Sequence, residues 1–314
     1  MEHDIAVGVD GSPASLAAAH WAAQEAQRRG SGLVVVHACN RHPRPAPNVP
    51  LDRAGHDRAE EILHEAVRSV AAAHPALRVT ERLVRDSTAA ALVAAAADSA
   101  MLVLGSLGPG PVTGLVTGAV SQRVVARSPH PVVLVRPGRG AGQDHLPATD
   151  GVAPDEIPRT PYREIVLGLD TDRPCDEVIA FAFEAARWRG TGLRVIHAFR
   201  APARPASDAS LVTAPPAAAR PVSPWRAPGE AQADAERSVT AVLRAWREKH
   251  PDVPVTESVT EGRAAAALRH AARGAGLLVV GRRTTGHAFA ARTGPVTHAA
   301  LQHAGCPVAV VPHD

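Results

Sequence analysis

The chain has 314 residues and a formal net charge of +3, with its basic residues interleaved with acids, so it is long enough for about two domains and lacks a nucleic-acid-binding patch. Its three scattered cysteines form no CxxC pair, which argues against structural zinc and against a disulfide framework. It shows neither a signal peptide nor an apolar run long enough to span a membrane, so we expect a cytoplasmic protein with no nucleic-acid or membrane partner.

The first half alternates short apolar runs with helical patterns, which is typical of a parallel sheet with helices on both faces. Ser12 and Pro13 predict the start of the first helix, and Gly30 predicts its end. The predicted strands are 5–9, 33–38, 77–84, 101–104 and 131–135, and the predicted helices are 13–29, 57–74, 87–98 and 118–127. Open sheets of this kind bind ligands at the carboxyl ends of their strands.

The second half of the chain repeats the first. IAVGVDGS and GLVVVHA, which begin at residues 5 and 32, return 160 residues later as IVLGLDTD and GLRVIHA. MLVLG and HPVVLV, which begin at residues 101 and 130, return 176 residues later as LLVVG and CPVAVV. We therefore predict a first domain at 1–137, a linker at 138–160 and a second domain at 161–314, with a Pro- and Ala-rich loop insertion at 201–229.

A glycine-rich stretch follows the predicted strand at 101–104. Five glycines lie within GSLGPGPVTGLVTGAVS, residues 105–121. The bare N–H groups of such a loop, together with the positive end of the next helix, can cradle a phosphate. A P-loop is excluded because the chain's one lysine, Lys249, lies elsewhere. A dinucleotide fingerprint is excluded because Asp10-Gly11-Ser12 follows the first strand.

The spacing Gly105-x2-Gly108-x9-Gly118 resembles the G-x2-G-x9-G-Ser/Thr signature of the universal stress protein family. That family also carries an Asp at the end of its first strand and a His near the end of its second. The matching residues are Asp10 and His37 in the first half, and Asp170 and His197 in the second. The resemblance is to a tandem, two-domain member. It implies an α/β fold of two doubly wound, open parallel-sheet domains, with strand order 3-2-1-4-5.

The resemblance also implies an ATP-binding crevice, with or without Mg²⁺, between the first and fourth strands. Asp10 would contact the ribose or base, Ala38 would line the adenine pocket, and the helix start after the glycine stretch would meet the phosphates. The residues assigned to this site are Gly8, Asp10, Ser12, Ala38, Gly105, Ser106, Gly108, Gly118, Ala119 and Val120. Ala119 stands where the family usually has Ser or Thr, which removes one hydroxyl donor.

The second domain is predicted to have a degenerate site. Thr284 replaces the middle glycine, and Pro295 removes both a hydroxyl and an N–H group. The weaker counterparts that remain are Asp170, Ala198, Gly281 and Gly294. The guanidinium groups of Arg282, Arg283 and Arg292 can still attract an anion.

These features predict an adenine-nucleotide-binding, regulatory stress-response protein without enzymatic activity, because no acid, base and nucleophile stand together. The alternative is a scaffold of the same fold that binds no nucleotide and acts through dimerisation and an unknown protein partner. A nucleotide-dependent ligase would instead carry its glycine loop after the first strand. Asp10 is equally explained as part of the helix cap with Ser12, and the histidines His37 and His197 as satisfied sheet residues rather than metal ligands.

The last strand of each half is apolar and would leave a bare sheet edge. In the resembling family the final strands of two domains pair antiparallel across a two-fold axis. We therefore expect Val132–Val135 to pair with Val308–Val311 within one molecule, because the linker holds the halves at high effective concentration. The alternative is two independent domains with covered edges. The sequence leaves open whether such pseudo-dimers assemble further into homo-oligomers.

Overall fold

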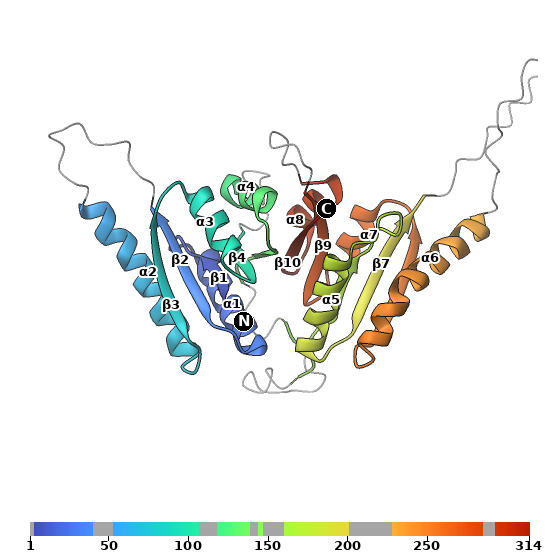
Figure 1. Ribbon diagram of the computed structural model, residues 1–314, viewed down its shortest axis with the longest axis horizontal. Coiled ribbons are helices and arrows are strands. Elements are labelled where there is room, and N and C mark those ends of the chain that lie inside the picture. Colours follow the sequence, from blue (N-terminus) through green and yellow to red (C-terminus); the bar gives the residue numbers. More distant parts are fainter. Residues whose placement is uncertain are drawn as a thin grey trace, which may run out of the picture.

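The computed structural model describes residues 3–39, 53–106, 118–138, 144–146, 160–200, 228–284 and 293–314. Ten strands form one open sheet in the order β3-β2-β1-β4-β5-β10-β9-β6-β7-β8. Each half therefore has the predicted strand order 3-2-1-4-5, and all strand pairs within a half are parallel. The two halves lie side by side in Figure 1, with α2 and α6 at opposite ends of the molecule.

The elements of the first half confirm the predicted alternation of strands and helices. They are β1 Ile5–Gly8, α1 Pro13–Arg29, β2 Leu33–Cys39, α2 Arg53–Ala73, β3 Val79–Arg85, α3 Thr88–Ala97, β4 Met101–Gly105, α4 Ala119–Arg127 and β5 Val132–Val135. Ser12 caps α1, because its Oγ accepts a hydrogen bond from Ser15 N at 3.1 Å. Gly30 ends α1 in the left-handed conformation with φ of 67°.

The second half has the same elements. They are β6 Ile165–Gly168, α5 Asp176–Arg189, β7 Leu193–Phe199, α6 Pro228–Lys249, β8 Val255–Glu261, α7 Ala264–Ala271, β9 Leu277–Arg283, α8 Pro295–His303 and β10 Val308–His313. Pro228 and Gly229, which were expected in the loop insertion, are instead the first residues of α6. The rest of the insertion, 201–227, lies outside the described residues. Helix α5 begins at Asp176, three residues after Arg173, the residue that corresponds to Pro13 at the start of α1.

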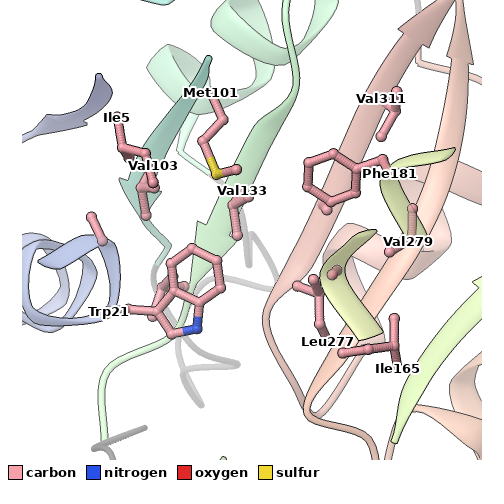
Figure 2. Close-up of a cluster of buried hydrophobic side chains, with 14 of the residues drawn as sticks. Ile5, Trp21, Met101, Val103, Val133, Ile165, Phe181, Leu277, Val279 and Val311 are labelled. Carbon is pink, nitrogen blue, oxygen red and sulfur yellow. The ribbon is translucent and has the colours of Figure 1, made fainter. Parts of the chain in front are cut away.

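The sheet is packed on both faces, and two hydrophobic clusters run through both halves. Side chains alternate along β1, so Ile5 and Val7 join α1 and α2 while Ala6 joins α3 and α4 on the other face. Figure 2 shows the first cluster on either side of the junction, with Trp21 near Val133 in one half and Phe181 near Val311 in the other. The two halves therefore share cores rather than forming separate ones.

The final strands pair within one molecule, as predicted. Strand β10 runs antiparallel to β5, with Val308 opposite Leu134, Ala309 opposite Val133 and Val310 opposite Val132. All of these side chains are buried. This pairing gives the backbone groups at the edge of each five-stranded half a hydrogen-bonding partner. It confirms the intramolecular pseudo-dimer.

Two arginines clamp the junction by binding the last carbonyls of a helix in the opposite half. Arg136, after β5, donates from Nη2 to Leu301 O and Gln302 O of α8, at 3.2 and 2.7 Å. Arg282, on β9, donates to Ala126 O of α4 at 3.1 Å, and to Ser128 O just after α4 at 2.6 Å. A cation is favoured at a helix C-terminus.

A buried charge cluster joins α1 and α5 on one face of the junction. The carboxylate of Glu25 accepts hydrogen bonds from Arg189 and Arg29 at 2.7 Å each, and from Arg28 at 3.1 Å. The Glu25 and Arg189 side chains are 1% and 2% exposed. Burial alone would raise the pKa of Glu25, but the three arginines outweigh it and lower the pKa from 4.5 to about 2.

Part of the linker packs against this cluster. Asp144 is buried, and burial raises its pKa above the ordinary value although Arg189 and Arg28 act in the opposite sense. Its carbonyl accepts a hydrogen bond from Arg163 N at 2.8 Å, and its neighbour His145 stacks on Tyr162 with ring centroids 4.0 Å apart. The described linker residues 144–146 are therefore held by contacts with the second half.

Candidate functional site

The turn after β1 presents Asp10 at the carboxyl end of the sheet. Its Oδ1 accepts a hydrogen bond from Ser12 N at 2.9 Å, and its own N–H donates to Ser15 Oγ at 3.2 Å. Burial would raise the pKa of Asp10, but the hydrogen bonds from Ser12 and Ser15 hold the pKa below its ordinary value. Asp10 is thus an exposed, ionised carboxylate that also shapes the start of α1.

A histidine on the second strand of each half fixes the turn that follows the first strand. His37 Nδ1 donates to Val9 O at 2.7 Å, and His197 Nδ1 donates to Leu169 O at 3.1 Å. Each ring is buried. The carbonyl acceptor requires the proton on Nδ1. These histidines are satisfied sheet residues, which agrees with the structural interpretation drawn from the sequence.

The first residues of the glycine stretch are explained by packing. A Cβ on Gly105 would lie 2.6 Å from the carbonyl carbon of Ala14 and 2.7 Å from Ser15 N, so glycine lets β4 pass the first turn of α1. Ser106 is buried and bonded to β5, with its N–H 2.8 Å from Val135 O. What approaches the backbone at this point is therefore α1. Gly8 is similarly confined, because a Cβ there would lie 2.7 Å from a Leu104 methyl.

The start of α4 is different, because neither packing nor conformation requires its glycine. Gly118 is the N-cap, with φ of −61° and ψ of 152° and no side-chain cap bond. Among the described residues nothing lies within 4 Å of a Cβ built on it. The first N–H groups of a helix have no partner within the helix, and those of Ala119 and Val120, which are exposed residues, bind no acceptor among the described residues. Gly108 lies in 107–117, outside the described residues.

In the second half the predicted site residues surround one cavity of about 1110 Å³. The cavity lies at the carboxyl ends of β6, β7 and β9, beside the start of α5. Asp170, Ala198, Gly281 and Gly294 all line it. These four residues, which the sequence analysis assigned to the weaker second site, thus lie around one cavity.

Two lining residues of this cavity were missed by the sequence analysis. The His313 side chain, near the end of β10, covers Gly281, where a Cβ would lie 2.8 Å from its Nε2. Thr297 Oγ1 donates to Gly281 O at 2.8 Å and so ties α8 to the strand end. The prediction for Arg282 was wrong, because its guanidinium group binds carbonyls at the end of α4 instead of facing an anion. Arg292 lies outside the described residues.

Two other features of the described residues concern metal binding and membrane spanning. Within the described ranges, no three His, Cys, Asp or Glu side chains are grouped so that they could hold a metal ion. The helices in that part of the chain are also too short or too polar to cross a bilayer.

Comparisons with known proteins agree with this architecture. The model of the "Universal stress protein family" matches residues 1–136 and 161–312. A universal stress protein of Mycobacterium tuberculosis is 30% identical over 316 residues, which cover 98% of this chain and 97% of that protein. A second one from the same organism is 27% identical over 335 residues, covering 99% and 96%.

Among solved structures, the crystal structure of a universal stress protein from Archaeoglobus fulgidus superposes with a TM-score of 0.67 at 16% identity. It covers 100% of both chains, which supports the fold across the whole length. The family model matches both halves, and the relatives match over nearly the full length of the chain. The chain therefore belongs to the universal stress protein family.

Proposed function

We propose that this protein binds an adenine nucleotide, ATP, chiefly in the crevice of its first half, and acts in the stress response as a regulatory protein rather than an enzyme. The observation that carries this proposal is the start of α4. There Gly118, which has no packing role among the described residues, precedes helix N–H groups that have no partner in that part of the chain. The ionised carboxylate of Asp10 belongs to the same edge of the sheet.

The pseudo-symmetry of the two halves supports this assignment. Gly294 and Asp170, the counterparts of Gly118 and Asp10, line a single cavity in the second half. The equivalent first-half residues occupy the same strand ends and helix start, next to the β1–β4 pair. In the proposed complex Asp10 contacts the ribose or base and Ala38 lines the adenine pocket.

The phosphates, with or without Mg²⁺, meet the N–H groups of Ala119 and Val120. The missing hydroxyl at Ala119 weakens this contact without removing it, since the backbone donor is present.

The remaining assignments follow from the family and the sequence. The proposed domains are 1–137 and 161–314, joined by the linker 138–160, and the proposed location is the cytoplasm. A protein partner would bind the intramolecular pseudo-dimer and respond to whether the nucleotide is bound.

A second candidate function is a scaffold that binds no nucleotide. Two observations favour it: Gly105 and Ser106 have packing explanations, and Ala119 lacks the hydroxyl of the family signature. The two functions differ in one measurable property, which is the affinity of the first half for ATP.

A matched pair of glycine substitutions tests the proposal in the full chain. Gly118→Val and Gly294→Val change equivalent N-caps, with φ of −61° and −58°, and neither Cβ meets a described atom within 4 Å. Calorimetric titration should show ATP binding lost in Gly118→Val and kept in Gly294→Val, with unchanged melting temperatures. No ATP binding to the wild type, or equal effects of both substitutions, contradicts the proposal.

A further inference from the structure

The crevice of the second half is lined by arginines from four separate segments. Arg173 lies between β6 and α5, Arg200 follows β7, Arg263 precedes α7 and Arg283 ends β9. All four line the cavity of about 1110 Å³, and all four are exposed. No hydrogen bond or ion pair joins any of their side chains to a residue in the described ranges. Their guanidinium groups are therefore available to a ligand at this cavity.

These arginines are specific to the second half. At the offsets that relate the halves, the first half has uncharged residues at all four positions. The counterparts are Pro13, Asn40, Ser87 and Leu107. The second half, whose glycine stretch lacks the middle glycine, thus carries arginine at four positions. These positions are far apart in the sequence but line the same cavity.

Carboxylates at the same cavity offset only part of this charge. Asp170 accepts a hydrogen bond from Asp172 N at 3.1 Å, and Asp234 is paired with Arg237 on α6. Asp172 is the third acidic residue that lines the cavity. Arg282 also lines it but is engaged at the end of α4. The cavity is therefore lined by four arginines without a described partner and by three carboxylates, one of which is paired. The positive charge exceeds the negative charge, so the cavity attracts anions.

The start of α8 explains why side chains would take over phosphate binding here. Pro295 at the first helical position has no N–H, so the backbone cradle at Gly294 is one donor short. Guanidinium groups supply donors in a fixed fork that fits phosphate oxygens. Behind them, buried Ile196, Leu268 and Val280 form an apolar wall.

We propose that the second half is a separate site for a small polyanion with two or more phosphate groups, held by arginine side chains rather than by a glycine loop. The site goes beyond the adenine nucleotide proposed for the first half and does not depend on it. The cavity is large enough for an organic ligand, since such sites typically measure about 300–1,000 Å³.

Inorganic tripolyphosphate is the probe that tests this site. It is titrated by calorimetry at low ionic strength, where exposed charges are least screened, into the full chain carrying Gly118→Val so that the first half does not contribute. Arg263→Ala/Arg283→Ala removes two lining guanidinium groups. The matched control, Arg269→Ala/Arg273→Ala, removes two exposed arginines of the same half that do not line the cavity.

We expect the Gly118→Val protein to bind tripolyphosphate, and the Arg263→Ala/Arg283→Ala pair to weaken binding at least about tenfold, as expected for lost charge-assisted hydrogen bonds. The control pair should weaken binding clearly less, because Arg269 and Arg273 do not line the cavity and donate no hydrogen bond to a ligand there. Absence of binding, or equal weakening by both pairs, overturns the proposal. ATP titrated into the wild type and into Gly118→Val reports separately on the first half, so either proposal can fail alone.

Discussion

Removing the charge of Glu25 should destabilise the junction between the two halves. Its carboxylate is 1% exposed and accepts hydrogen bonds from Arg28, Arg29 and Arg189. Glu25→Gln keeps the shape of the side chain. It leaves the three guanidinium groups with one nearby buried carboxyl, Asp144, whose pKa is raised by burial. An incompletely compensated set of buried cations is costly.

Two independent arguments give the same order of magnitude for this loss. Breaking a buried ion pair by removing one partner costs about 3–5 kcal/mol of unfolding free energy. The pKa of Glu25 falls from 4.5 to about 2 on folding, which at about 1.4 kcal/mol per unit corresponds to about 3 kcal/mol. We therefore expect Glu25→Gln to lose about 3 kcal/mol at neutral pH.

The pH dependence of stability carries the same signature. The pKa of Glu25 is lower in the folded state, so its contribution is fully present above about pH 4.5 and is lost as the pH falls from there through 2. The wild type should therefore lose stability across this window. Glu25→Gln should lose less, because its amide does not titrate.

Urea unfolding followed by circular dichroism, from neutral pH down to acid, measures both effects. Glu184→Gln is the control, because Glu184 is an exposed glutamate on α5. A surface substitution of this kind should change stability by less than about 0.5 kcal/mol. The reasoning is refuted if Glu25→Gln lies within about 1 kcal/mol of Glu184→Gln, or if it keeps the acid slope of the wild type.

Two further predictions concern packing and the sheet edge. Gly105→Ala places a Cβ 2.6 Å from the Ala14 carbonyl carbon and should cost about 1–3 kcal/mol; an unchanged thermal midpoint in calorimetry would contradict this. Residues 1–137 expressed alone would expose Val132–Val135, which β10 covers in the full chain, so they should self-associate. Sedimentation should show dimers or larger species, and a stable monomer would count against the role assigned to the strand.

The order of elements was predictable from the sequence because buried parallel strands and their connecting helices leave strong local patterns. The cap at Ser12, the stop at Gly30 and the pairing of the last strands were all confirmed. The start of α6 at Pro228 was missed because the composition of the preceding tract continues into its first residues. Proline is tolerated in the first turn of a helix, so it does not mark a boundary there.

The roles of individual site residues were harder to predict, because they depend on what lies opposite in space. Gly105 belongs to a ligand-type motif, yet the atoms that confine it come from α1. Arg282 lies near the end of β9 at a position expected for an anion contact, yet its guanidinium group donates to carbonyl oxygens at the end of α4 in the other half. The lining arginines Arg173, Arg200 and Arg263 were detectable by comparing the two halves position by position, but they stand out only once one cavity brings them together.

The arginines at the junction and those that line the second cavity form two groups that lie apart in the fold. Arg136, Arg189 and Arg282 each bind carbonyl or carboxylate oxygens of the opposite half across the junction. A planar guanidinium group suits such contacts because it offers several donors and stays charged when buried. The chain has one lysine among 34 basic residues, which fits that use.

The arginines of the second cavity differ from those of the junction in their exposure and in their partners. The four lining arginines have similar donors, but they are exposed and have no described protein oxygen to bind. A contribution to the junction cannot explain them, because the junction is formed by β5, β10 and the helices beside them. Repulsion among these four cations slightly opposes folding. The anionic ligand that we propose for this cavity would neutralise that charge when bound.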